Sequence, residues 1–241
     1  HPGRTRQSAL HRRHQPLPGA ESQNNALRID KEPMITEEEV LGKITEIYAI
    51  LVQFRGKYQQ QKPFKVELAQ YLQAAYRENP KLIVELFWRD FEGKFDKPNR
   101  PAPYCDYLFS TITESPNSIG IELACQLMIH EDHSYQEDSA RFLYDAKDPV
   151  AVPFLIEGLN SHDYGVVRES ALALGNIGDL RAETYLLELV TKYDNDETYS
   201  EDRLDDAYPI IRASAFTALC LLNSKAANEK IIESIFGDRD K

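Results

Sequence analysis

This chain of 241 residues contains an internal repeat, which restricts the folds that it can adopt. Residues 123–148 match residues 154–179 at a shift of 31 positions, and parts of a third copy match at shifts of 44 and 45. A period of this length is typical of arrays in which each unit packs against its neighbours. The matching residues are His130-Glu131-Asp132 with Ser161-His162-Asp163, Ser139-Ala140 with Ser170-Ala171, Leu143 with Leu174, Asp148 with Asp179, Val167-Arg168 with Ile211-Arg212, and Ala173-Leu174 with Ala218-Leu219.

Each repeat has the pattern of a helix, a turn that contains an aspartate, a second helix, and a short turn into the next unit. One helical pair cannot bury both of its faces, so stacked pairs would share a continuous core and leave a long surface open. No segment shows the alternating pattern of a strand. The sequence therefore predicts an all-α protein with roughly eleven helices.

The segment 167–182 closely resembles the HEAT-like repeat of the phycobilisome-lyase type, and the resemblance extends over about residues 118–236. It implies an α-α superhelix, a right-handed HEAT-like solenoid. The spacing from Arg168 to Gly175 is one residue shorter than the family pattern, and Glu137 stands where the family has an arginine. The edges of the repeats are therefore expected to be irregular.

The resemblance also implies roles for two pairs of charged residues. In proteins with this repeat, residues that correspond to Asp163, Arg168, Asp206 and Arg212 bond between neighbouring repeats. Binding of an anionic ligand is the alternative. The same repeat occurs in bilin lyases, antenna-degradation factors, hydroxylases and many adaptors, so it implies a fold more strongly than a function.

Residues 34–115 are predicted to form a divergent helical cap before the repeats. Residues 36–39 have the sequence of a capping box, which starts a first helix. Pro63 is suited to the start of a second helix, and Asn79-Pro80 to the start of a third. The prolines of 92–103 predict a loop, and further helices are expected at about 104–114 and 118–130.

Residues 1–33 differ in composition from the remainder. They are basic and poor in large apolar residues, and such a segment cannot bury enough apolar surface to offset the entropy of ordering. A helical pattern begins at Met34. We expect Met34 to be the natural start, with 1–33 a disordered leader that is either processed or derived from an expression vector. A native disordered basic tail is the alternative.

Composition excludes several classes of function. The formal net charge of -11 argues against a general nucleic-acid binder, because neutralising phosphates needs clustered Lys and Arg. No apolar run reaches the roughly 18 residues of a membrane helix, and no secretory signal is present. Cys105, Cys125 and Cys220 form no close pair, which favours a reducing compartment, the cytoplasm.

Two segments offer metal-ligating side chains. Residues 130–133 read His-Glu-Asp-His, but the repeat alignment places them in a turn between paired helices. A di-iron hydroxylase of this repeat type would need several His-Glu pairs across its repeats. Residues 194–205 start like a calcium loop, yet Tyr199 stands where the sharp turn needs glycine, and Asp205 where a glutamate is needed. We expect no metal at either segment.

No nucleophile is placed beside a base. Cys125 and Cys220 lie at helical positions and are expected in the core, as is Trp88. Gly175 and Gly178 are expected to close a helix and not to cradle a phosphate. We therefore expect no catalytic residue and no cofactor.

The predicted binding surface lies on the second helices of the repeats. An acidic insertion at 193–206 in the last repeat is a second candidate, because insertions on solenoids tend to lie on one rim; a solvated loop is the alternative. The outward candidates are Glu169, Leu172, Asn176, Ala213, Thr217 and Leu221, and those of the insertion are Asp194, Asp196, Glu197 and Tyr199.

Residues 116–241 are thus predicted to be the HEAT-like repeats of a non-enzymatic scaffold or adaptor. It would grip a protein partner, expected to be basic, through its concave face; neither nucleic acid nor a membrane is expected as a partner. A bilin lyase or a phycobilisome-antenna chaperone or degradation factor is the second hypothesis, and it predicts a coloured protein when bilin is present. A bacterial immunity or regulatory adaptor is the third, and it predicts a salt-sensitive complex with a basic partner.

Overall fold

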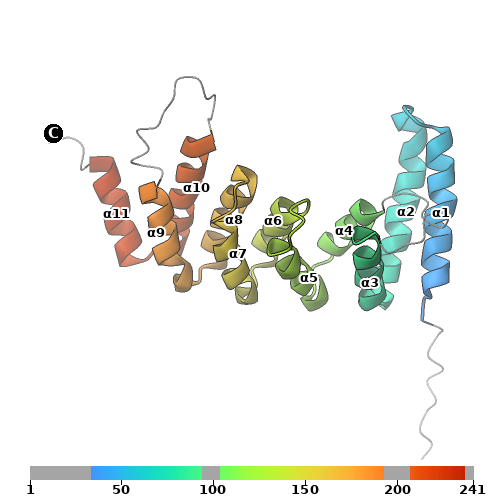
Figure 1. Ribbon diagram of the computed structural model, residues 1–241, viewed down its shortest axis with the longest axis horizontal. Coiled ribbons are helices and arrows are strands. Elements are labelled where there is room, and N and C mark those ends of the chain that lie inside the picture. The colour runs from blue at the N-terminus through green and yellow to red at the C-terminus, as the bar shows by residue number, and fades with distance from the viewer. Residues whose placement is uncertain (1–33, 94–103, 193–206, 237–241) are drawn as a thin grey trace, which may run out of the picture. The chain divides into compact units, whose positions relative to one another are not determined.

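The computed structural model describes residues 34–93, 104–192 and 207–236, which belong to a compact unit that begins at Met34. These ranges contain eleven α-helices, two short 3-10 helices and no strand, which confirms the all-α prediction (Figure 1). The predictions for 1–33 and for 193–206, including the calcium-like loop, lie outside the described residues. No helix in the described ranges is both long and apolar enough to cross a membrane.

Four helices precede the repeats, and two of their starts follow the predicted capping chemistry. Thr36 accepts a hydrogen bond from the backbone N–H of Glu39, whose carboxylate accepts the N–H of Thr36 in return. Asn79 caps the third helix by accepting the N–H of Leu82. The four helices are α1 (Glu37–Gln53), α2 (Tyr58–Glu78), α3 (Pro80–Phe91) and α4 (Cys105–Thr113).

The predicted start of the second helix at Pro63 is wrong. The helix begins at Tyr58, so that Pro63 lies inside it. A proline there removes one intrahelical hydrogen bond, which local propensity penalises. The packing of Leu68, Leu72 and Tyr76, all buried further along α2, outweighs this local cost.

Three helical pairs follow, and the second helices of successive pairs pack side by side. Helix α8 makes its most extensive contacts with α6 and α10, while α7 packs against α5 and α8. The pairs are α5 (Ser118–Met128) with α6 (Gln136–Ala146), α7 (Val152–Gly158) with α8 (Tyr164–Ile177), and α9 (Glu183–Lys192) with α10 (Ala207–Leu222). The 3-10 helices η2 (Pro149–Ala151) and η3 (Leu180–Ala182) lead into α7 and α9, and α11 (Lys225–Phe236) comes last.

The three second helices end in the same way, which confirms the repeat alignment in three dimensions. Lys147, Gly178 and Asn223 all have a left-handed backbone, with φ of 53°, 75° and 49°. The N–H groups of these residues bond to the carbonyls of Leu143, Leu174 and Leu219, respectively. This is the single hydrogen bond of the left-handed helix cap.

The residue after each of these caps starts the next helix. Asp148 and Asp179 accept the N–H groups of Val150 and Arg181 and so cap the two 3-10 helices. Ser224 accepts the N–H of Ala227 at the start of α11. Helix α11 therefore occupies the place of the first helix of a fourth unit, which the sequence alignment missed.

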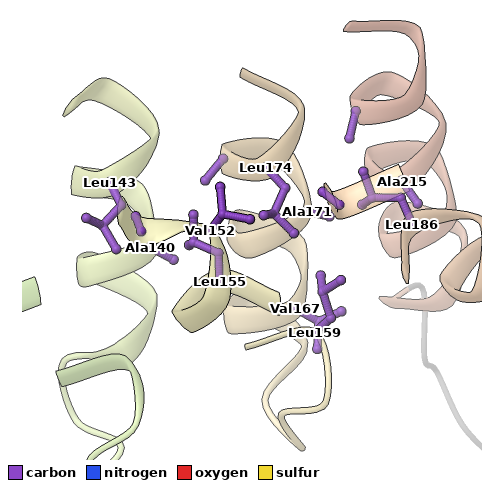
Figure 2. Packing of buried hydrophobic residues seen from close by; sticks show 14 of the residues in the cluster. Ala140, Leu143, Val152, Leu155, Leu159, Val167, Ala171, Leu174, Leu186 and Ala215 are labelled. Carbon is purple, nitrogen blue, oxygen red and sulfur yellow. The ribbon is translucent and has the colours of Figure 1, made fainter. Parts of the chain in front are cut away.

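Small and branched apolar side chains from successive helices build the core of the repeats (Figure 2). Helix α5 joins this core to that of the N-terminal helices, because residues on its two faces belong to different clusters. Cys125 and Met128 pack in the repeat core, and Leu123 and Leu127 in the N-terminal one. The buried repeat residues in Figure 2 include Ala140, Leu143, Val152, Leu155, Leu159, Val167, Ala171, Leu174, Leu186 and Ala215.

Glycine 175 sets the distance between α8 and α10. A Cβ at this position would lie 2.4 Å from the Cα of Ala218, so only glycine permits the observed approach. Gly175 lies inside α8, and the prediction that it closes a helix is wrong. Gly178 does close α8, as predicted.

Candidate protein-binding surface

The outer edges of α6, α8 and α10 form a candidate binding surface. Because the repeat alignment relates Glu137, Arg141 and Asp145 of α6 to Arg168, Leu172 and Asn176 of α8, these positions share one face of the stacked helices. All of them are at least partly exposed. We define the second-helix surface as Glu137, Arg141, Asp145, Arg168, Leu172, Asn176, Ala213, Phe216, Thr217 and Leu221.

Three of the predicted outward residues form an exposed stripe on α10. Ala213, Thr217 and Leu221 are spaced four residues apart, and all three are exposed. Leu221 is 51% exposed, so about half of this large apolar side chain is accessible to a partner. Leu172 on α8 is half-buried. That these residues contact a partner stays a prediction.

The prediction that Glu169 faces outward is wrong. Its carboxylate is paired with Arg168 at 2.5 Å and with Arg141 of the preceding repeat at 3.3 Å, and its side chain is only 11% exposed. Arg141 is also paired with Glu137 at 2.7 Å and with Asp138 at 3.0 Å. Glu169 therefore joins α6 to α8, and the arginine that covers it comes from a helix 28 residues away in the chain.

Asn176 also makes an inter-repeat contact. Its side-chain amide donates to the backbone carbonyl of Tyr144 on α6 at 2.8 Å, so part of this residue is committed to the stacking of the helices. Arg168 lies 3.7 Å from Glu137 of the preceding repeat, in line with the role that the family resemblance implies. Asp163 instead caps its own helix, by accepting the N–H groups at the start of α8. Asp206 lies outside the described residues.

Sequence reasoning missed Phe216, which corresponds to Leu172 at the 44-residue shift. This phenylalanine is partly exposed, and the guanidinium of Arg212 lies 5.6 Å from the centre of its ring. A cation above an aromatic face is a stabilising pair, and aromatic residues and arginine are enriched in protein interfaces. The repeat alignment could have found Phe216 as an outward position had the shift been applied to Leu172.

A groove opens beside this surface, between α4 and α6. Its volume is about 430 Å³. The extensive contacts of α6 are with α5 and α8, so its side toward α4 is left open. The groove is lined by Asp106, Phe109, Ser110, Thr113, Glu114, Tyr135, Asp138, Arg141, Phe142 and Asp145.

The His-Glu-Asp-His segment lies in the turn between α5 and α6, as predicted. The Nδ1 of His130 accepts the N–H of Asp132, and its ring packs against the rings of Trp88 and Phe91. Trp88 is partly buried and packs against the N-terminal core. In the described ranges, no group of three or more His, Cys, Asp or Glu is arranged to hold a metal ion.

The cysteines have different surroundings. Cys125 is buried as predicted, and burial raises the pKa of its thiol to about 11. Burial and a hydrogen bond to Asp90 raise the pKa of Cys105 to about 12, so both thiols stay protonated near neutral pH. The core prediction for Cys220 is wrong, because this residue lies on the exposed side of α10 next to Leu221.

A comparison with known protein families bears on the type of repeat. Residues 121–201 match HEAT repeats. The match runs from α5 to beyond α9 and covers about one third of the chain. No curated protein matches this chain. The HEAT repeats are thus shown, whereas the phycobilisome-lyase subtype stays a prediction.

Proposed function

We propose that this HEAT-repeat protein is a non-enzymatic scaffold or adaptor that holds a partner protein on the second-helix surface. The observation that carries the proposal is the alignment of corresponding outward positions on helices that pack side by side. Arg141, Leu172 and Phe216 stand on three successive second helices. Stacked helices of this kind provide an extended surface, and solenoid proteins use such surfaces for binding.

The chemistry of the surface also suits a protein partner. It combines the apolar side chains of Leu172 and Leu221 with two arginines and the ring of Phe216, and arginine and aromatic residues are enriched in protein interfaces. The net charge of -11 would attract a basic partner over long range and raise its rate of association at low salt. Cysteines that form no disulfide favour a reducing compartment such as the cytoplasm.

The test is affinity capture with the tagged full-length chain from a lysate of the source organism, read by mass spectrometry. The variant carries Ala213→Arg, Thr217→Arg and Leu221→Arg, which add three charges to the exposed stripe of α10 without touching the core. The matched control carries Gln126→Arg, Thr184→Arg and Thr191→Arg, which add the same charge at exposed positions of α5 and α9, both first helices.

We expect one partner to bind the wild type and the control and to be lost from the α10 variant. Loss from both variants would point to general charge repulsion, and retention by the α10 variant would contradict the proposed surface. An eluate that contains a bilin or an antenna subunit would favour the lyase or antenna-chaperone hypothesis instead.

A further inference from the structure

We propose that the groove between α4 and α6 binds an arginine side chain within a basic segment of the partner protein. This inference rests on the proposed function and deepens it, because it names the chemistry by which the partner is anchored. The groove adjoins the second-helix surface, since Arg141 and Asp145 belong to both. A segment that crosses α6 could therefore insert a side chain here.

The walls of the groove are acidic. Helix α4 contributes Asp106 and Glu114, and α6 contributes Asp138 and Asp145. Arg141, the one cation among the described residues of the lining, is already paired with three carboxylates of α6 and α8. The lining therefore keeps an excess of negative charge after its own ion pairs are counted, which favours a cationic occupant.

The four carboxylates differ in how they are engaged. Asp138 is paired with Arg141, Glu114 accepts the side-chain amide of Gln73 at 2.9 Å, and Asp106 accepts the hydroxyl of Tyr135 at 2.6 Å. Asp145 is exposed and makes no hydrogen bond or ion pair with any residue in the described ranges. It is the carboxylate that a guanidinium could bind without displacing an existing partner.

Aromatic rings complete the lining. Phe109 and Phe142 are buried, and Tyr135 is partly exposed. The centroid of the Tyr135 ring lies 4.9 Å from that of the Phe109 ring, and the Tyr135 hydroxyl donates a hydrogen bond to Asp106. Burial and this hydrogen bond raise the pKa of Tyr135 well above its ordinary value, so the phenol remains a neutral donor.

Carboxylates beside aromatic rings suit arginine better than lysine. The planar guanidinium can donate two parallel hydrogen bonds to one carboxylate and stack on an aromatic face, whereas the ammonium group is a strongly hydrated point charge. The volume of about 430 Å³ is at the small end of the range of ligand sites, which suits one or a few side chains. An acidic segment would be repelled.

The probe for the test is a fluorescent octapeptide of arginine, compared with octapeptides of lysine and of glutamate, and binding to the full-length chain is followed by anisotropy. The variant is Asp145→Lys. The matched control is Glu188→Lys, which makes the same change of charge at an exposed position of α9 outside the groove. Circular dichroism of both variants checks that they fold.

We expect saturable binding of the arginine peptide, weaker binding of the lysine peptide, and no binding of the glutamate peptide. Asp145→Lys should weaken arginine binding about tenfold or more, because it places a like charge in the groove, while Glu188→Lys should change it little. Equal weakening by both variants, equal binding of lysine and arginine, or no binding of arginine would each overturn the proposal.

The fate of the captured partner separates this inference from the proposed function. If the partner is lost from the α10 variant but retained by Asp145→Lys, the second-helix surface holds the partner and the groove inference fails. If the α10 variant and Asp145→Lys both lose the partner and Glu188→Lys retains it, the proposed function and the groove inference are both supported. Retention of the partner by the α10 variant would contradict the proposed function, regardless of how the octapeptides bind.

Discussion

At the scale of single residues, the left-handed caps show how each repeat ends. The second helices close with Lys147, Gly178 and Asn223, of which only glycine adopts this backbone without a steric cost. Asparagine tolerates it better than most residues, and lysine does so poorly. Lys147 is therefore a position where the fold tolerates a residue that local conformation disfavours.

The first prediction follows from this cap. Replacing Lys147 by glycine should raise the free energy of unfolding by about 1 kcal/mol, because it removes the strain of a Cβ in the left-handed region. Chemical denaturation by urea measures the change. Gly178→Ala is the matched control and should lower the stability by a similar amount. An unchanged or lower stability of Lys147→Gly would contradict this account of the cap.

A second residue-scale prediction concerns Asp179. Hydrogen bonds from the side chain and the backbone of Arg181 lower the pKa of Asp179 to about 2. Because the folded pKa lies below the unfolded value near 4, the ionised carboxylate stabilises the fold above about pH 4 and loses this effect as the pH falls toward 2. The difference in melting temperature between the wild type and Asp179→Asn should therefore shrink on acidification.

Asp148 supplies the control for this pH dependence. It caps η2 as Asp179 caps η3, but the residue two positions later is Val150 and not an arginine. Asp148→Asn should therefore show a smaller difference from the wild type at pH 7 than Asp179→Asn. A difference for Asp179→Asn that stayed constant from pH 7 to pH 3 would refute the role of the ion pair with Arg181.

At the scale of helices, the approach of α8 and α10 gives the third prediction. Gly175→Ala places a methyl group 2.4 Å from a backbone atom of Ala218, so the helices must move apart. We expect a loss of about 1–3 kcal/mol in the free energy of unfolding, as for other overpacked cores. Urea denaturation measures it.

Gly42→Ala in α1 is the matched control for this substitution. Nothing lies within 4 Å of a Cβ at Gly42, and α1 is regular there. Alanine should stabilise α1 by about 0.5–1 kcal/mol, because glycine costs this much in a helix interior. If both substitutions changed stability alike, the close contact between α8 and α10 would not be what Gly175 is needed for.

The sequence predicts a feature of these helices well when its cause is local. The capping box at Thr36, the cap at Asn79 and the period of 31 residues depend on neighbours along the chain. The errors at Glu169 and Pro63 have distant causes: an arginine from the preceding repeat in one case, and packing of the apolar face in the other. The helical pattern of a single segment does not show which distant residues will contact it.

The cap of α4 shows the same limit. Its first N–H groups are bound by Asp90 of α3, which is fully buried and accepts the N–H groups of Tyr104 and Cys105. A cap from a side chain 14 and 15 residues away has no local signature in the sequence. The groove between α4 and α6 could not be predicted from the sequence either, because it depends on how two helices that are distant in the chain lie beside each other.

At the scale of the molecule, the repeats and the preceding helices meet through α5 and through a cluster of rings. Leu123 and Leu127 of α5 pack with the N-terminal helices, and the ring of Tyr135 contacts those of Phe87 and Phe109. The N-terminal helices thus do more than cover the end of the stack, because α4 supplies one wall of the groove. This connection places the groove between α4 and α6 beside the second-helix surface.

Hydrogen–deuterium exchange of the full-length chain, with and without its captured partner, would show directly whether the second helices hold the partner. We expect slower exchange in peptides from α6, α8 and α10 when the partner is bound, and little change in peptides from α7 and α9. Protection confined to the first helices of the pairs, or absent from α8 and α10, would contradict the claim that the second helices hold the partner.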